Sequence, residues 1–379
     1  MVYYSYMSFL DSIKDIFSGL EQGKAGTYVG IDIGSSFIKI VQAKKDNGRL
    51  VLETYGEVAL GPYDNERFAG ELTNLEPEKM VEAIKNLLEQ ANVTAKNAVI
   101  SVSSATSLIF ILKLPKIKDS ELDSVVKNEA RKYIPVPLTE VSLDWWIIPE
   151  KEIYSEEDEN SNKNKTKDID VLVAAVRNEV VERYNKVTTM LGKFTATEYE
   201  IETFSAIRAS FKHELAPVML VDFGASGTRV SVIEHGVVRK FHSINRGSAY
   251  LSSSLQKSLQ IEFNEAEKLK REVGLDNTHQ NQEAYNIILA GTNYIFSEVK
   301  NVLFDFEKEY KKPVHKIILT GGGSRLINFK DQLESKYDIT TVHADPFDKI
   351  MSPDFLEEVL KQAGPEFVVA VGLALQGLE

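Results

Sequence analysis

The chain has 379 residues, of which 43% are apolar and 26% are charged, so it can form two or three domains with an ample core. Its formal net charge of −12 argues against a nucleic-acid-binding surface, which needs a clustered basic face. The absence of cysteine excludes disulfides, thiolate nucleophiles and cysteine-ligated metals. No apolar run approaches the roughly twenty residues of a membrane span, and the sequence predicts a cytoplasmic protein.

The first 26 residues predict a short amphipathic helix and a flexible joint. Ser8 and Asp11 are spaced as in a capping box, and residues 23–26 have the composition of a linker. Such a helix could dock on the body of the protein, on a partner or on a membrane surface, and acidic residues on its polar side favour docking on protein. Its apolar face would consist of Phe9, Ile13, Ile16, Phe17 and Leu20.

Residues 28–41 predict a β-strand, a tight turn and a second strand. Gly34 allows the backbone to come close to a ligand, and the hydroxyls and successive amides of Ser35 and Ser36 suit an anion. Asp32 lies beside this turn, where a hydrated metal would bridge it to a phosphate. One such turn is weak evidence, because Asp-x-Gly turns are common in any hairpin.

The same pattern returns at residues 218–233. Asp222, Gly224 and Ser226 follow an apolar strand, and a basic residue and another strand come after them. Each copy continues with a hairpin-turn signal and a third β-rich run, at Asp46-Asn47-Gly48 with residues 49–58 and at Glu234-His235-Gly236 with residues 237–244. This internal repeat predicts two related lobes, each offering a phosphate-binding turn to a shared cleft.

Between the two copies, the sequence predicts the alternating strands and helices of an α/β protein. A helix over 77–91 and a strand over 97–103 complete the first unit. A second unit is predicted from strand 108–114, helix 119–133, strand 143–148, a polar loop at 150–168, strand 170–176 and helix 178–191. A helix over 198–211 then returns the chain to the first lobe.

After the second copy, helices are predicted over 248–260, 264–273 and 285–310. A strand over 316–320 leads directly into Gly321-Gly322-Gly323-Ser324, which is predicted to open a helix through residue 333. Residues 365–375 form a mostly apolar helix, which has to be buried between other elements.

Two features of this half bear on ligand binding. Three successive glycines between a strand and a helix favour contact with a planar or charged ligand, since a tight turn alone needs one. Glu267 and Lys270 lie three residues apart on one helical face, as a surface ion pair or as ribose ligands, and the spacing alone favours the surface pair. The sequence has no Walker-type loop, nucleophile elbow or clustered histidine metal site.

In this order, the motifs resemble the phosphate and adenosine motifs of the superfamily of actin, heat-shock chaperone and sugar-kinase ATPases. Within it, the chain resembles the PilM family of actin-like proteins of type IV pilus assembly, which is related to the division protein FtsA. The resemblance covers nearly the whole chain from residue 28, without the N-terminal helix and the acidic loop. It is carried by residues 29–36, 131–138, 142–144, 199–204, 345–347 and 370–374.

The resemblance implies an actin-like α/β fold, in which two lobes of duplicated sheet and helix units surround a nucleotide cleft. It assigns an N-terminal helix and linker, a first lobe, an inserted subdomain of the FtsA type, a resumed first lobe, a second lobe and a C-terminal segment returning to the first lobe. Their ranges are 1–26, 27–105, 106–193, 194–216, 217–340 and 341–379.

ATP and Mg²⁺ are the ligands that the resemblance implies. Asp32 and Asp222 would hold the ion through water. Glu202 would lie near the attacking water, but its surroundings depart from the chaperone pattern, so at most weak ATPase activity is expected. The other contacts would be Gly34, Ser35, Ser36, Lys39, Gly224, Ala225, Ser226 and Thr228 for the phosphates, Glu267 and Lys270 for the ribose, and Gly321, Gly322, Gly323 and Ser324 for the adenine side.

The resemblance also implies partners. A scaffold of this family binds the short cytoplasmic N-terminal segment of a PilN-like inner-membrane protein in a groove between the insert and the first lobe. It would lie at the inner membrane through such partners, without a span of its own, beside the pilus platform and motor components. Whether it forms a homo-oligomer stays open.

Three alternatives remain. An FtsA-like division protein would need a C-terminal amphipathic membrane helix, whereas this chain ends directly after the buried helix. A small-molecule kinase would need a substrate pocket built by larger inserts. The cytoplasmic domain of a type II secretion platform protein would normally continue into a membrane span.

Overall fold

The computed structural model describes residues 26–65, 67–148, 168–212, 214 and 216–378. The predicted N-terminal helix and most of the predicted acidic loop lie outside these ranges. The described chain divides into two compact units, a smaller one of residues 106–182 and a larger one of residues 26–105 and 183–378. In these ranges no helix has both the length and the apolar character that crossing a lipid bilayer requires.

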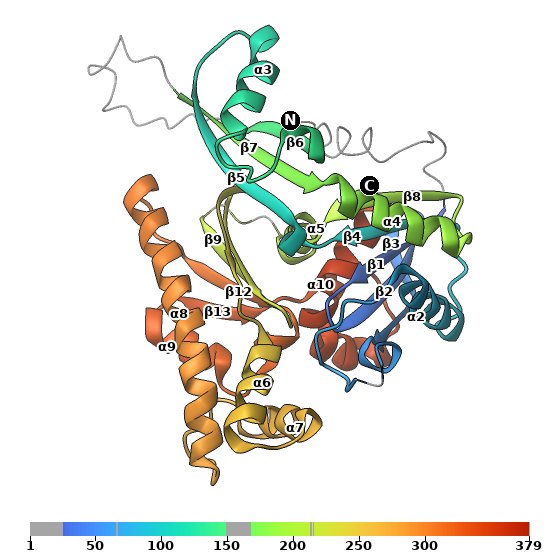
Figure 1. Ribbon diagram of the computed structural model, residues 1–379, viewed down its shortest axis with the longest axis vertical. Coiled ribbons are helices and arrows are strands. Elements are labelled where there is room, and N and C mark those ends of the chain that lie inside the picture. The colour runs from blue at the N-terminus through green and yellow to red at the C-terminus, as the bar shows by residue number, and fades with distance from the viewer. Residues whose placement is uncertain (1–25, 66, 149–167, 213, 215, 379) are drawn as a thin grey trace. The chain divides into compact units, whose positions relative to one another are not determined.

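Within the larger unit, two five-stranded sheets have the same topology (Figure 1). In each, three consecutive strands pair antiparallel, and the first of them also pairs with a parallel strand that has a second parallel neighbour. The first sheet has the order β3-β2-β1-β4-β8, with β1 (Thr27–Ile33), β2 (Phe37–Asp46), β3 (Arg49–Ala59), β4 (Asn97–Val102) and β8 (Ala196–Ile201). The second has the order β11-β10-β9-β12-β13, with β9 (Val218–Phe223), β10 (Thr228–Glu234), β11 (Val237–Ile244), β12 (Lys316–Thr320) and β13 (Thr340–His343).

The likeness of the two sheets extends to their irregularities. The pairing of β2 with β3 shifts register after Gln42, and the pairing of β10 with β11 shifts register after Val232. These two positions are 190 residues apart, and so are Asp32 and Asp222. The hairpin turns at Asn47-Gly48 and His235-Gly236 have positive φ at both residues, as a two-residue type I′ turn requires. These findings confirm the predicted repeat of strand, turn, strand, turn and strand.

The helices of the larger unit pack around these sheets. One hydrophobic core contains residues of both sheets together with α5 and α10, and the other contains residues of the second sheet together with α6, α7, α8 and α9. Figure 1 shows the C-terminal helix α10 among them, and it contacts β1, β2 and α5. Nearly all of its residues from Gly364 onward are buried, which confirms the predicted buried helix. The helices are α2 (Pro77–Gln90), α5 (Glu202–Ser210), α6 (Ser248–Leu259), α7 (Phe263–Val273), α8 (Gln282–Tyr310), α9 (Phe329–Tyr337) and α10 (Glu357–Leu378), and the larger unit also includes α4 (Asn178–Leu191) from residue 183 onward.

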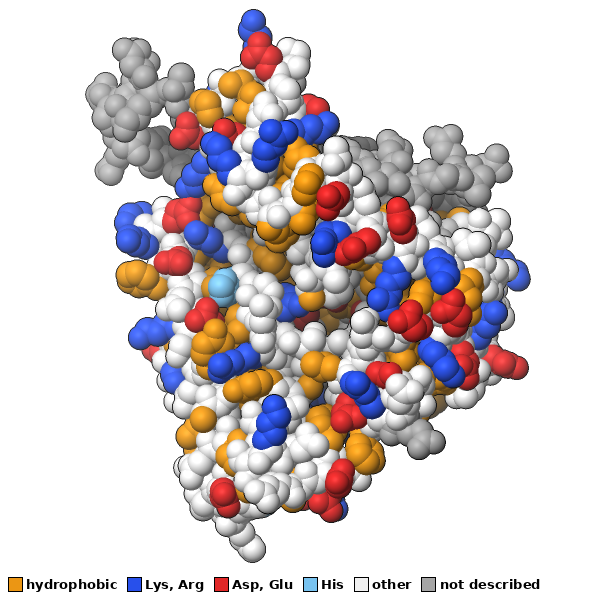
Figure 2. Space-filling model, in the orientation of Figure 1, with side chains coloured by type: hydrophobic (Ala, Val, Ile, Leu, Met, Phe, Trp, Pro, Cys, Tyr) orange, Lys and Arg blue, Asp and Glu red, His pale blue; other side chains and the backbone are white. Residues whose placement is uncertain are grey.

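The smaller unit is an antiparallel three-stranded sheet with a helix on one face. The sheet has the order β5-β7-β6, with β5 (Ser107–Pro115), β6 (Val141–Ile148) and β7 (Asp168–Arg177), and the helix is α3 (Asp119–Ala130). Leu112, Val126 and Val173 belong to its core. In Figure 2, acidic and basic side chains are interspersed over the visible face of the protein, with no single-sign surface.

Two predicted helices were wrong in part. Residues 196–201 form strand β8, which pairs parallel with β4, and α5 begins only at Glu202. The glycine-rich segment opens a short 3₁₀ helix, η5 (Gly322–Arg325), and α9 begins at Phe329, after Asn328 has adopted a left-handed conformation. Both differences matter for the site, because they fix where Glu202 and the glycines lie.

Candidate functional site

A cavity of about 640 Å³ lies in the larger unit and is lined by both sheets. Its wall collects most of the residues that the sequence singled out, from segments up to some 290 positions apart. They are Asp32, Gly34, Ser35, Ser36, Lys39, Glu202, Asp222, Gly224, Ala225, Ser226, Glu267, Lys270, Gly321, Gly322 and Gly323. Thr228 and Ser324 do not line the cavity.

The turn between β1 and β2 is held by bonds on both sides. The Gly34 amide donates to the Phe37 carbonyl at 3.0 Å, and the Ser35 carbonyl accepts from the Thr73 amide at 2.9 Å. Lys39 stands opposite Asp32 in the strand register, and its Nζ lies 5.3 Å from the centroid of the Phe37 ring. The turn therefore presents a fixed backbone edge to the cavity with a cation close by.

The turn between β9 and β10 has the same geometry and is also held by hydrogen bonds from the start of α6. The Gly224 amide donates to the Gly227 carbonyl at 3.0 Å. The carbonyls of Gly224 and Ala225 accept from the amides of Ser248 and Ala249, at the start of α6. Fully buried Thr228 donates from its hydroxyl to the Arg246 carbonyl at 2.8 Å, so it supports the loop before α6.

Three carboxylates in the wall of the cavity, those of Asp32, Asp222 and Glu202, influence one another electrostatically. Burial, with Glu202 nearby, raises the pKa of Asp32 to about 6, although Lys39 and Ser101 act in the opposite direction. Burial and the charge of Glu202 raise the pKa of Asp222 to about 7, and Asp32 adds to the rise while Arg229 opposes it. Glu202, the first residue of α5, accepts the Ser104 amide at 2.9 Å. A cation would stabilise these charged groups.

The donor set fits a hydrated Mg²⁺ ion. The described residues contain no group of three or more acidic or histidine side chains that could enclose a metal directly. Asp32 and Asp222 both border the cavity, and Mg²⁺ typically uses one or two carboxylates and completes its shell with water and phosphate oxygens.

The glycine-rich segment after β12 is shaped by packing as well as by the cavity. Gly321 has a φ of 80°, and a Cβ there would lie 2.5 Å from Oδ1 of Asp222. A Cβ on Gly323 would lie 2.6 Å from the Phe223 ring, and buried Ser324 donates to the Gly321 carbonyl at 2.7 Å. At Gly322 the nearest atom to such a Cβ is 3.8 Å away, on Glu366. Two of the three glycines therefore have a packing reason, whereas a Cβ at the third would make only ordinary van der Waals contacts.

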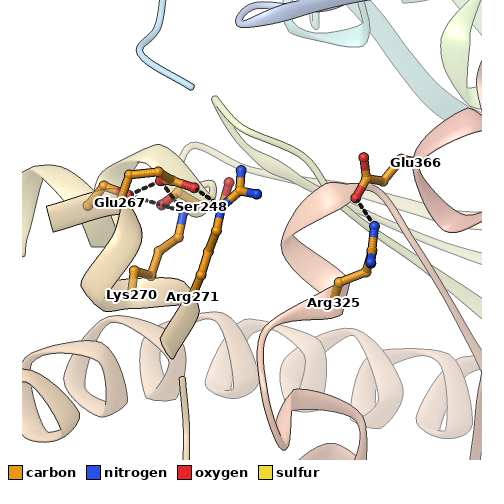
Figure 3. A network of polar contacts seen from close by, with 7 residues as sticks. Ser248, Glu267, Lys270, Arg271, Arg325 and Glu366 are labelled. Carbon is orange, nitrogen blue, oxygen red and sulfur yellow. Dashed lines mark hydrogen bonds and ion pairs between the residues drawn. The ribbon is translucent and has the colours of Figure 1, made fainter. Parts of the chain in front are cut away.

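The pair on α7 is buried, so its interpretation as a surface ion pair was wrong. Lys270 is 5% exposed, and its Nζ lies 2.6 Å from Glu267 (Figure 3). Glu267 also accepts from Ser252 at 2.6 Å and from Nε of Arg271 at 2.8 Å. Burial lowers the pKa of Lys270, although Glu267 acts against this. Burial alone would raise the pKa of Glu267, but these partners hold it below its ordinary value.

Sequence reasoning missed several charged residues in the wall. Figure 3 shows Arg271 on α7 and, across a gap, Arg325 on η5 with Glu366 of α10. Nη1 of Arg325 lies 2.7 Å from Oε1 of Glu366. Arg229 on β10 also lines the cavity; the sequence includes it as the basic residue of the second repeat but does not assign it to the site. Their positions in the sequence could have indicated them, because each arginine directly follows a recognised motif.

Comparisons with known proteins identify one family and several solved structures of similar fold. The model of the family described as type IV pilus assembly protein PilM matches residues 30–378. The structure of a PilM–PilN type IV pilus biogenesis complex matches with a TM-score of 0.76 and 23% identity, over 95% of this chain and 100% of that chain. The ethanolamine utilization protein EutJ from Carboxydothermus hydrogenoformans matches with a TM-score of 0.52 and 14% identity, over 97% and 96%. MreB 5 of Spiroplasma citri bound to AMPPNP matches with a TM-score of 0.50 and 12% identity, over 92% and 95%, so the fold is that of these proteins.

Proposed function

The chain belongs to the PilM family of type IV pilus assembly proteins, and from this premise we propose that it is an ATP-binding scaffold on the cytoplasmic side of the inner membrane. The observation that carries the proposal is the cavity between two copies of one hairpin, in which paired aspartates, turn amides and cations converge. Such an arrangement suits a polyphosphate with a divalent cation. The AMPPNP bound by MreB 5 of Spiroplasma citri, a protein of this fold, supports a nucleotide as the ligand.

In this proposal the cavity has a phosphate end and a base end. Asp32 and Asp222 would hold hydrated Mg²⁺, which would offset the charge of the phosphates. The two turns, at residues 34–36 and 224–226, would bind the β- and γ-phosphates together with Lys39. At the other end, the buried pair of Glu267 and Lys270 would bind the ribose hydroxyls, since an anchored carboxylate and ammonium offer an acceptor and a donor.

The base would lie between Arg271 and Arg325. Each guanidinium is held by a carboxylate, Glu267 for Arg271 and Glu366 for Arg325, so its plane is oriented before the ligand arrives. A planar guanidinium stacks on aromatic rings. The absence of a side chain at Gly322, which lines the cavity, lets the base approach the backbone.

We infer that hydrolysis is slow at most. Glu202 is the candidate for orienting a water, but its Oε1 accepts the Ser104 amide and so helps to position the start of α5. The protein would then act by holding ATP. ATP would shift the protein between two conformations only if it binds one of them more tightly.

The partner we propose is the short cytoplasmic N-terminal segment of a PilN-like inner-membrane protein. The structural match to a PilM–PilN complex over 95% of the chain supports this partner. The nucleotide would alter the affinity for that segment, and contacts with other platform and motor components would follow from this assembly.

Calorimetry on the full chain tests the nucleotide site. We expect Mg-ATP to bind the wild type and Asp222→Ala to lose at least about tenfold in affinity, because it loses a carboxylate that would hold the hydrated ion. Asp305→Ala, on the exposed side of α8, is the matched control and should bind as the wild type does. Equal binding by all three proteins would remove Asp222 from the site.

A pull-down tests the scaffold. The bait is a synthetic peptide with the N-terminal sequence of a PilN-like membrane protein, and a scrambled peptide is the control. Retention of the protein by the first peptide, with a change on adding Mg-ATP, is the expected result. Equal retention by both peptides would contradict the proposed partner.

A further inference from the structure

Arg229 is a buried cation in the wall of the cavity. It is 7% exposed, and its Nε has no hydrogen-bond partner among the described residues. Its Nη1 donates to the Thr228 carbonyl at the long distance of 3.4 Å. A guanidinium carries five donors and stays charged, so burying it with its donors underused is unfavourable unless a ligand completes its bonds.

The turn of the second hairpin makes room for this side chain. A Cβ on Gly227 would lie 2.3 Å from Nη1 of Arg229, so only glycine at this position lets the guanidinium lie against the turn. The same turn borders the cavity with Gly224, Ala225 and Ser226. The cation therefore sits beside the backbone to which the proposed function assigns the phosphates.

Arg229 occupies the position in the second hairpin that Lys39 occupies in the first. Arg229 follows Asp222 by seven residues and stands opposite it across β9 and β10, as Lys39 follows and faces Asp32 across β1 and β2. Asp222 interacts electrostatically with Arg229, Lys39 and Asp32, so these charges converge at one end of the cavity. Each lobe thus supplies one aspartate and one cation to the wall of the cavity.

We propose that Arg229 binds the terminal phosphate of a nucleoside triphosphate and makes the cavity prefer a triphosphate to a diphosphate. This inference rests on the proposed nucleotide site. A diphosphate would reach the turns and the ion but would leave Arg229 as it is in the empty cavity. A terminal phosphate would accept from the unused donors, and guanidinium–phosphate pairs are among the stronger hydrogen bonds in proteins.

The test is calorimetry on the full chain with Mg-AMPPNP and Mg-ADP. For the wild type we expect tighter binding of AMPPNP. Arg229→Met should lose about tenfold to a hundredfold in affinity for AMPPNP and less than about threefold for ADP. Arg229→Lys keeps the positive charge but lacks the planar guanidinium with its several donors, so its affinity for AMPPNP should lie between those of the wild type and Arg229→Met. Arg271→Met, the matched substitution at the base end, should weaken both nucleotides by the same factor.

Thermal unfolding without nucleotide separates this role from a structural one. If Arg229 serves the ligand, Arg229→Met should leave the melting temperature unchanged or raise it, because an underused buried charge is removed. A large fall would make Arg229 a structural partner of Asp222 and overturn the inference, as would equal losses for AMPPNP and ADP. If Arg229→Met does not fold, the ratio of the affinities for AMPPNP and ADP, measured for Arg229→Lys, tests the inference in its place. Failure of the wild type to bind either nucleotide would instead overturn the proposed function.

Discussion

The β1–β2 and β9–β10 hairpins have turns of the same backbone geometry, but their cations lie in different environments. In both, the glycine after the aspartate donates to the carbonyl three residues on, at 3.0 Å. In the first hairpin that fourth residue is Phe37, and Lys39 lies partly exposed over its ring. In the second it is Gly227, and Arg229 is buried against it.

The difference shows how one turn position decides what the neighbouring cation can do. An aromatic ring at this position satisfies the lysine by a cation–π contact and keeps it near solvent. Glycine at this position leaves room for the arginine to be buried against the turn. The duplicated lobes are therefore alike in backbone geometry but differ in how far each cation is buried.

The pH dependence of stability should show the largest contrast between the hairpins. Asp32 and Asp222 have a folded-state pKa of about 6 and about 7, above the ordinary value of 3.8. Between that value and the raised ones, the folded protein binds more protons than the unfolded chain, so stability is lost as pH rises through 6 and 7. We expect the free energy of unfolding without nucleotide and Mg²⁺ to fall by on the order of a few kcal/mol from pH 5 to pH 8 in urea titrations.

Substitution of each aspartate sharpens this comparison. Asp222→Asn should flatten the pH profile more than Asp32→Asn does, because the larger shift is at Asp222. Mg²⁺ with ATP should also flatten the wild-type profile, since a cation favours the ionised forms. An identical slope in the wild type and both variants would show that these carboxylates do not titrate in this range.

The sequence predicted the two hairpins well because their determinants are local. The apolar residues of the strands and the spacing from Asp to Gly all lie within a few residues of one another. The second copy 190 residues later then implied a shared cleft, and the paired turns do line one cavity. The repeat thus carried long-range information that a single motif lacks.

What the sequence could not predict depends on tertiary contacts. Residues 198–201 of strand β8 were predicted as helix, because the pairing of the strand with β4, some hundred residues earlier, overrides local preference. Glu267 and Lys270 look like a surface pair until Ser252 of α6 packs beside them. Likewise, the need for glycine at 321 and 323 arises from Asp222 and Phe223 in another strand.

Adding a methyl group to the fourth turn position should have the next largest effect. Gly227→Ala places Cβ 2.3 Å from Nη1 of Arg229 and 2.8 Å from the Ile244 carbonyl, so the strand or the arginine has to move. We expect it to lower the free energy of unfolding by about 1–3 kcal/mol in urea denaturation. Gly322→Ala, whose Cβ would lie an ordinary 3.8 Å from the nearest atom, is the control and should change it by less than about 0.5 kcal/mol. Equal effects would mean that Arg229 is not tightly packed against the turn.

The smallest effect should come from the first hairpin, where the cation has a ring and partial access to solvent. A double-mutant cycle with Phe37→Leu, Lys39→Met and the double variant isolates the contact between Nζ and the ring, 5.3 Å apart. We expect a coupling energy of about 0.5 kcal/mol, within the range for exposed cation–π pairs. A coupling above about 2 kcal/mol would mean that Lys39 is shielded from water as Arg229 is. The two hairpins would then be equivalent, and the preference for a triphosphate would have to arise from both lobes together.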